Sequence, residues 1–488
     1  MTTVTKISLF NKIKNSKPIT FINKILSSAW GIGILGFITL LAHIFAIELA
    51  LYIFVAIYTV YVCIFSDDLL PLMPLFIFCY ISPSKNNNPA LTTNSVFYNQ
   101  SGIVILVILA ICIPAILVRI GFDKNMGYKK LFTQKRSLLS GICILGISYL
   151  LSGIGSSTYT SIAINNLVFS TLQFLSIFLL YFIFTATINW EKVNKQYFAW
   201  LGLFMGIIVS LELVNIYIIE QAIQNGSIIR GKLYTGWGHY NNIGALIAMS
   251  IPFAFYLACK KKHNYIFLIL GTLLLIALLL SCSRGSIVGG VIIYITSFVI
   301  TFFKAENKKI FRISTAILMA IGIICGIIFV DKLITLFEKV PSIIDTSNNS
   351  LAFNDSSRFV IYEEGFNAFL KYPIFGQSFY PTDFVPYDFS RLDSFSSFFP
   401  PRWHNTIIQI LSSCGIVGMI AYSFHRIQTI KLFFKKPTLE KTFIGLSIAV
   451  LLITSLLDCH FFNIGPTLFY SMALAFAEKV NIEHNKNK

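Results

Sequence analysis

Residues 264–303 read NYIFLILGTLLLIALLLSCSRGSIVGGVIIYITSFVITFF, and this stretch decides the fold class. Two charge-free runs, 264–281 and 285–303, flank a short turn that holds Arg284. A helix needs about 20 apolar residues to cross roughly 30 Å of hydrocarbon. The stretch therefore predicts two transmembrane helices joined by a tight turn.

The same pattern covers most of the 488 residues, of which 56% are hydrophobic and 12% charged. Soluble proteins carry about 25% charged residues, so this composition excludes a soluble enzyme and predicts an all-α polytopic membrane protein. The candidate spans lie at 25–43, 45–65, 69–83, 102–120, 137–154, 166–188, 197–219, 242–259, 264–281, 285–303, 311–330, 403–424, 442–457 and 460–477. We expect 12 to 14 helices, because run 69–83 is short and contains Pro71 and Pro74, which suit a re-entrant or kinked piece.

The basic residues predict the orientation. With a cytoplasmic N-terminus and every run crossing, 28 of the 38 Lys and Arg residues fall on the inside, as the positive-inside rule requires. Topology thus explains the net charge of +17, and no nucleic-acid partner is needed. Nine cysteines lie scattered without a CxxC pair, which argues against a disulfide framework or a zinc site. We expect a multi-pass protein of the cytoplasmic membrane with both termini inside.

Four regions follow from this topology: N-terminal helices at 1–190, helices with outer arginine loops at 191–330, an outer loop at 331–402, and C-terminal helices with a cytoplasmic tail at 403–488. A loop of about 70 residues is unusual and commonly functional. From Asp355 its apolar residues recur at three- and four-residue spacing, which predicts an amphipathic helix ending before Pro373. This helix either lies flat on the outer membrane surface or forms a lid that packs on the helix bundle.

The positive-inside rule does not explain the arginines that are expected on the outer side. They are Arg230, Arg284, Arg358, which opens the amphipathic helix, and Arg402. Guanidinium groups bind phosphate oxygens bidentately and keep their charge when buried. Several arginines around one set of helix ends therefore predict a binding site for a pyrophosphate group. Taken singly, each arginine is also explained by a side chain that snorkels to water or by an ordinary loop position.

His404 stands at the head of the span that follows the outer loop, where a neutral imidazole can accept a proton from a hydroxyl nucleophile. An N-cap histidine is the simpler alternative. His239, His460 and Asp458 lie on the same side, but no ligand spacing supports a metal site there. Glu212 lies inside a span and needs a partner, which Arg230 or Arg284 could supply.

These residues make the chain resemble the O-antigen ligase and O-antigen polymerase superfamily over roughly 200–425. The matching elements are Arg230 followed by GWGHYNN, SRG at 283–285, Arg358 with Gly365, YPIFGQS at 372–378, and HN at 404–405 with Gly415 and Gly418 beyond. The resemblance implies a GT-C-like helical membrane fold and a glycan donor on undecaprenyl diphosphate, used without a metal or other cofactor. It implies that Arg230 and Arg284 hold the diphosphate and that His404 activates the acceptor. Arg358 matches a loop arginine of less settled role, which we group with the diphosphate-binding residues. Our further supporting candidates are Asn405, Arg402, Tyr240 and Glu212.

The function expected from this resemblance is polymerisation of lipid-linked repeats on the outer face, with inversion at the anomeric carbon. A glycan or lipid-anchored acceptor and the bilayer are the expected partners, and a chain-length regulator is a further one. A ligase delivering polymer to lipid A–core is the alternative, since no residue separates the two. A flippase is a more distant alternative, because transporters place polar residues near the midplane and here these residues gather on one face. An O-acyltransferase is a third alternative, but it draws its acyl donor from the cytoplasm, so His404 would have to face inward.

Overall fold

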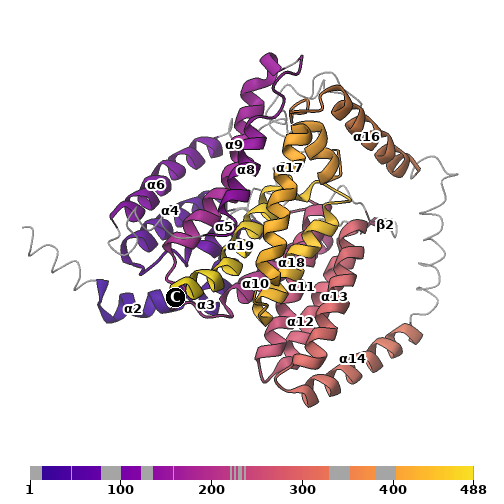
Figure 1. The fold of residues 1–488 in the computed structure, drawn as a ribbon. Coiled ribbons are helices and arrows are strands. Elements are labelled where there is room, and N and C mark those ends of the chain that lie inside the picture. The colour runs from indigo at the N-terminus through magenta and orange to yellow at the C-terminus, as the bar shows by residue number, and fades with distance from the viewer. Residues whose placement is uncertain are drawn as a thin grey trace, which may run out of the picture.

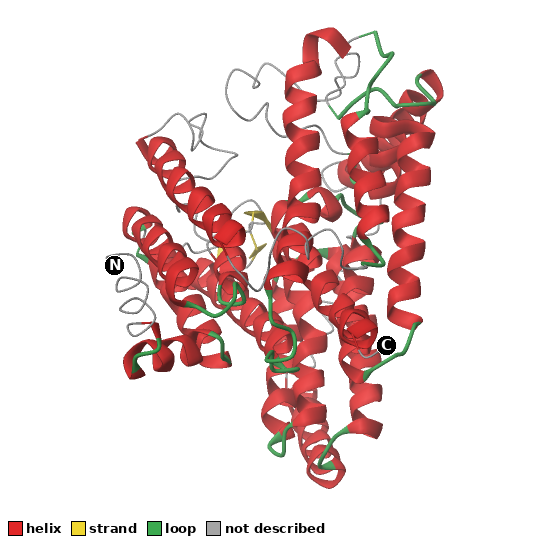
Figure 2. Cartoon of the chain, turned by 60° about the vertical axis from the view of Figure 1, so that its left-hand side comes forward, coloured by secondary structure: helices red, strands yellow, loops and turns green. Residues whose placement is uncertain are grey.

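The computed structural model describes residues 14–45, 47–78, 100–122, 136–157, 159–219, 223–224, 227–228, 233–235, 238–328, 352–379 and 403–486. These residues are almost entirely helical (Figures 1 and 2). They contain five helices long and apolar enough to cross a membrane, or six if one bent pair is a single span, and four shorter apolar helices. The prediction of an all-α polytopic membrane protein is confirmed, whereas the count of 12 to 14 spans stays a prediction.

The N-terminal helices are α2 (Lys17–Leu26), α3 (Ala29–Ile44), α4 (Glu48–Phe65), α5 (Leu72–Phe78) and α6 (Gln100–Phe122). Helices α2 and α3 form the bent pair, with an angle of 74° between them. Within run 69–83, the described helix α5 has only seven residues, and six of them are buried. These seven residues are too few to cross a bilayer. Residues 79–83 of the run lie outside the described part of the chain, so the re-entrant or kinked piece stays a prediction.

The middle of the chain forms α8 (Leu139–Leu150), α9 (Tyr159–Thr187), α10 (Tyr197–Ile219), α11 (Tyr240–Lys260), α12 (Asn264–Leu280), α13 (Arg284–Lys304) and α14 (Lys308–Ile328). Helix α11 is the centre of this part: it packs against α10, α12, α13 and, from later in the chain, α18 (Leu439–Thr454). Nearly all of its side chains are buried. A helix that is apolar on every side is suited to such a position.

Two small antiparallel hairpins lie between α10 and α11. Strand β1 (Ile223–Gln224) pairs with β2 (Ser227–Ile228), and β3 (Tyr234–Thr235) pairs with β4 (Gly238–His239). The second hairpin leads directly into α11 and contacts α10. The second hairpin therefore lies beside the first residues of α11.

The last elements are α16 (Ala352–Lys371), α17 (Thr406–Phe434), α18 (Leu439–Thr454), the 3₁₀ turn η5 (His460–Phe462) and α19 (Ile464–Lys486). Helix α16 confirms the helix predicted in the outer loop, and it packs against α17 (Figure 1). Its buried face is Ile361, Gly365 and Ala368, whereas Phe366 and Leu370 are exposed. The contact favours a lid packed on the bundle. Within the predicted apolar stripe, Phe366 and Leu370 lie on the exposed side of α16.

Gly365 explains how the two helices come so close. A Cβ atom at this position would lie 2.5 Å from Ile408 Cγ2 and 3.0 Å from Trp403. Any larger residue would push α16 away from the start of α17.

Helix α17 is broken at Gly415, where φ is 63° and ψ is −157°. The segment after α16 fills the break: Ile416 N donates to Pro373 O (2.8 Å) and Gln377 N donates to Ser412 O (2.8 Å). Backbone groups freed by a broken helix need such partners. The YPIFGQS segment is thus a backbone insert that fixes the two halves of α17.

The second half of α17 corrects the expected span at 403–424, because the helix continues to Phe434. Arg426, which the expected bounds left outside the span, therefore lies within this helix. Its guanidinium is 4.5 Å from the centre of the Tyr422 ring and 4.3 Å from that of Phe461. Aromatic faces stabilise this buried cation.

Candidate functional site

His404 occupies an unusual backbone position before α17. Its φ is 49°, in the left-handed region that is costly for a residue with a side chain. On its N-terminal side, Trp403 N donates to Gln409 Oε1 (3.1 Å). On its C-terminal side, Asn405 Oδ1 caps α17 by accepting from Ile407 N (2.8 Å). Strain held by its surroundings is common at functional positions and motivates a functional hypothesis.

Helices α18 and α16 also hold the segment that contains His404. Asn405 Nδ2 donates to Leu456 O (2.9 Å) and Thr406 N donates to Ser455 O (2.9 Å), which ties it to the end of α18. From α16, the Tyr362 hydroxyl donates to the carbonyl oxygen of His404 (3.2 Å). The backbone of His404 is thus fixed by α16, α17 and α18 together.

The imidazole of His404 contacts the carboxylate of Asp458. Nδ1 lies 3.4 Å from Asp458 Oδ1, and the two side chains are 37% and 13% exposed. An ionised carboxylate only accepts hydrogen bonds, so a neutral imidazole in this orientation carries its proton on Nδ1 and its lone pair on Nε2. Within the described part of the chain, Nε2 of His404 makes no hydrogen bond. A histidine oriented in this way is suited to act as a general base.

Asp458 is held as an anion by its surroundings. Burial raises the pKa of this carboxyl, but the hydrogen bond from His404, the neighbouring His460 ring and the Cys459 N–H outweigh burial and hold that pKa well below its usual range. Cys459 N donates to Oδ1 (2.7 Å) and Asn241 Nδ2 donates to Oδ2 (2.7 Å). The carboxylate is therefore fixed in position and charge.

Asn241 extends this network to the SRG turn. Its Oδ1 atom accepts from Ser283 Oγ (3.0 Å). Ser283 is the N-cap residue of α13, and Arg284 is the first residue of that helix. Arg284 is exposed at this helix start. A chain of side-chain contacts thus connects His404, Asp458, Asn241 and the residue next to Arg284.

Asn242 makes a second connection to the loop after α18. Its Oδ1 atom lies 3.1 Å from His460 Nδ1 and accepts a hydrogen bond from Asn463 Nδ2. Both asparagines of the GWGHYNN motif therefore contact residues 458–463. This explains why the motif carries two adjacent amides at the start of α11.

Comparison with known proteins identifies part of the chain. Residues 269–423 match the O-antigen ligase family. This segment is similar to an O-antigen ligase domain. It spans α12, α13, α14, α16 and the first half of α17, and it supports the resemblance to the ligase and polymerase superfamily. No curated protein matches the chain.

The O-antigen ligase domain contains Arg284, Arg358 and His404 but ends before Asp458. Asn241, at the head of α11, lies before it. The hydrogen-bonded network therefore joins the domain to helices on both of its sides. The family match implies a glycosyl-transferring enzyme in a broad sense and an integral membrane protein.

The structure accounts unevenly for the other predicted site residues of this O-antigen ligase-like chain. Arg230 and Arg402 lie outside the described residues, and so does the side chain of Arg358, whose backbone belongs to α16. Tyr240 is the first residue of α11 and is half-buried beside Asn241. Asn405 serves as the cap of α17, a structural role.

The predicted pairing of Glu212 with Arg284 is wrong. Glu212 is fully buried in α10, and neither carboxylate oxygen has a hydrogen-bond partner among the residues described. Arg284 instead begins α13 at an exposed position. Pairing with Arg230 stays untested, because that residue is outside the described ranges.

Sequence reasoning did not assign Asp458, Asn241 and Ser283 to the proton-accepting site. Asp458 entered only as a candidate metal ligand, yet His460 from the same set contacts Asn242. Within the described ranges, no three His, Cys, Asp or Glu residues are grouped to hold a metal ion. A single acidic residue between two apolar runs was the available signal for Asp458.

Proposed function

We propose that this chain transfers a glycan from undecaprenyl diphosphate to a sugar hydroxyl at the outer face of the cytoplasmic membrane, with both of its own termini inside. The observation that carries the proposal is the contact between His404 and Asp458, joined through Asn241 and Ser283 to the Arg284 turn. It combines a base for the acceptor with a cation for the leaving group. The O-antigen ligase domain supports this class of reaction.

The proposed step is a single displacement. The acceptor hydroxyl gives its proton to Nε2 of His404 while its oxygen forms the new bond to the anomeric carbon. The bond from that carbon to the diphosphate breaks, and undecaprenyl diphosphate leaves with the electron pair. Attack opposite the leaving group inverts the anomeric carbon, and Arg284, with Arg230 and Arg358, stabilises the charge that develops on the diphosphate.

We favour a polymerase, which joins a growing chain to the next lipid-linked repeat, and keep the ligase as the alternative. The deciding experiment gives the purified protein a lipid-linked repeat as both donor and acceptor. A polymerase makes products of several repeats, whereas a ligase makes none until a separate acceptor is added. Absence of transfer under both conditions would contradict the proposed function.

Replacing Asp458 with asparagine should lower the transfer rate roughly 10²- to 10⁴-fold, because the neutral amide no longer holds the proton on Nδ1. The measurement is the turnover number with purified protein and lipid-linked repeat. Asp67→Asn is the matched control, since its side chain is 75% exposed in a pair with Lys192, and it should keep the wild-type rate. An Asp458→Asn enzyme with normal turnover would remove this carboxylate from the mechanism.

Replacing Arg284 with alanine should reduce transfer at least about 100-fold, as loss of a charge-stabilising donor does in other enzymes. Arg284→Lys should also be impaired, because one ammonium cannot reproduce a bidentate guanidinium contact. Both rates are measured at matched amounts of folded protein. Full activity of Arg284→Lys would show that the positive charge, and not the bidentate guanidinium contact, stabilises the leaving group. Wild-type activity of Arg284→Ala would show that Arg284 takes no part in the reaction.

A further inference from the structure

A second set of polar residues lies at the other end of the same helices. Helices α11 and α13 each run for 21 residues, from the Asn241 and Ser283 network to Lys260 and Lys304. At 1.5 Å per residue, that length is about 30 Å. The turns that follow these helices are therefore a membrane thickness away from His404, and α14 begins there (Figure 1).

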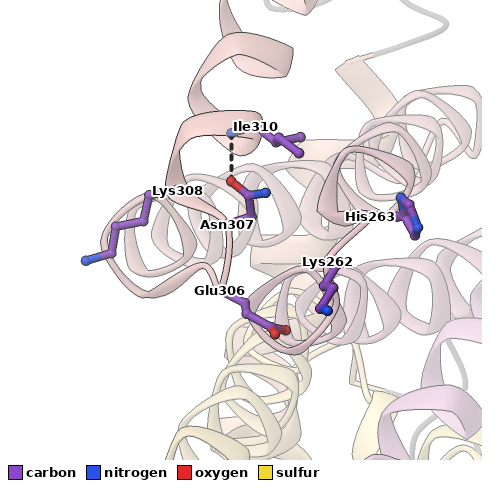
Figure 3. A pocket seen from close by; sticks show the side chains of 6 residues that line it. All are labelled: Lys262, His263, Glu306, Asn307, Lys308 and Ile310. Carbon is purple, nitrogen blue, oxygen red and sulfur yellow. Dashed lines mark hydrogen bonds between the residues drawn. The ribbon is translucent and has the colours of Figure 1, made fainter.

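The turn between α11 and α12 and the turn between α13 and α14 form the walls of an open pocket. Its volume is about 580 Å³, and Figure 3 shows it from close by. It is lined by Lys262, His263, Glu306, Asn307, Lys308 and Ile310. Its two sides are joined, because Asn264 Nδ2 donates to Asn307 O (2.8 Å). Asn307 Oδ1 in turn accepts from Ile310 N (3.1 Å) at the start of α14. The pocket is thus part of the folded helix ends.

The charge around the pocket is strongly positive. Residues 260–263 and 304–312 contain seven Lys or Arg residues and one acidic residue, Glu306. Figure 3 shows Glu306 near Lys262, with Lys308 extending away from both. The N-terminus of α14 lies at the same place and adds the positive end of a helix dipole. This combination attracts an anion, and Glu306 weakens the attraction only in part.

Apolar side chains continue from the pocket along the outside of the bundle. On α12, Ile266 and Ile269 are 43% and 46% exposed, and on α14, Ile313 and Ile317 are 50% and 55% exposed. Helix α14 packs against α12 and α13. A ligand bound at the two turns would therefore contact lysines with its head and the exposed isoleucines of α12 and α14 with its tail.

We propose that this pocket binds the phosphate headgroup of an anionic membrane phospholipid, whose acyl chains lie along α12 and α14. Basic pockets between transmembrane helices recognise lipid headgroups in this way. The phosphate lies beside Lys262 at the start of α14, and Lys308 adds positive charge from the other side of the pocket. The exposed isoleucines next to the pocket favour a lipid over a free anion. The proposal is independent of the reaction at His404.

The test measures retention of phosphatidylglycerol and of phosphatidylcholine by the full-length protein, using native mass spectrometry from mixed micelles. Each lysine near an anionic headgroup contributes about fivefold in affinity. Allowing for Glu306, we expect Lys262→Gln/Lys308→Gln to lose roughly tenfold in preference for phosphatidylglycerol. Glu306→Gln should bind that lipid more tightly than the wild type, which no folding defect would produce.

Lys435→Gln/Lys436→Gln is the matched control, because it removes two exposed cations from the turn between α17 and α18. It should keep the lipid preference. Equal loss in this control, or no preference for phosphatidylglycerol in the wild type, would overturn the proposal. Displacement of the lipid by millimolar inorganic phosphate would also overturn it, since the phosphate alone would then account for binding.

Discussion

Replacing His404 with alanine should abolish glycan transfer, lowering the rate by about 10²- to 10⁴-fold, the usual contribution of a positioned general base. The reason is that Nδ1 of His404 faces Asp458, which leaves Nε2 to take the proton of the acceptor hydroxyl. The measurement is the transfer rate from purified lipid-linked repeat. The amount of folded protein should stay near the wild-type level, because the His404 ring is 37% exposed.

His404→Asn is the informative companion variant. Asparagine tolerates the left-handed backbone that this position adopts, at φ 49°, but it cannot accept the proton. It should therefore be as inactive as His404→Ala while remaining folded. Transfer at the wild-type rate in either variant would show that His404 is only a residue at the start of α17.

Replacing Gly415 with alanine should have the largest effect on stability. A Cβ atom there would lie 2.4 Å from Ile374 O and 2.7 Å from Gly376 N, and the backbone has φ 63°. A left-handed position costs a residue with a side chain about 1–3 kcal/mol, and the contact with the inserted segment adds to this cost. We expect most of the protein to be lost from the folded fraction, as measured by thermal unfolding and gel filtration in detergent.

Gly322→Ala is the control for this substitution. Gly322 lies in α14, and a Cβ atom there has no heavy atom within 4 Å. Alanine should leave the folded yield unchanged or raise stability by up to about 1 kcal/mol, because alanine is the better helix former. Equal stability of the Gly415→Ala protein would show that the broken helix rearranges without cost.

The sequence by itself determined the fold class and most helix positions. Span prediction works because each membrane helix must satisfy its own backbone and supply about 20 apolar residues in one stretch. Run 242–259 thus became α11 and run 285–303 became α13. Hydropathy is a local property, so it located these helices without their neighbours. It failed at the end of α17, where aromatic side chains from other segments make a buried Arg426 tolerable.

The candidate site was only partly predictable, because sequence patterns are local and the site joins distant parts of the chain. His404 and Arg284 carry chemistry that residue type alone suggests, and each stands at the end of an apolar run. The carboxylate that orients His404 is 54 residues further along the chain, and the amide that holds this carboxylate is 217 residues away from it. Packing of α11, α13, α17 and α18 brings these side chains within hydrogen-bonding distance. No local pattern encodes that approach, so the tertiary structure alone decided which acidic residue faces His404.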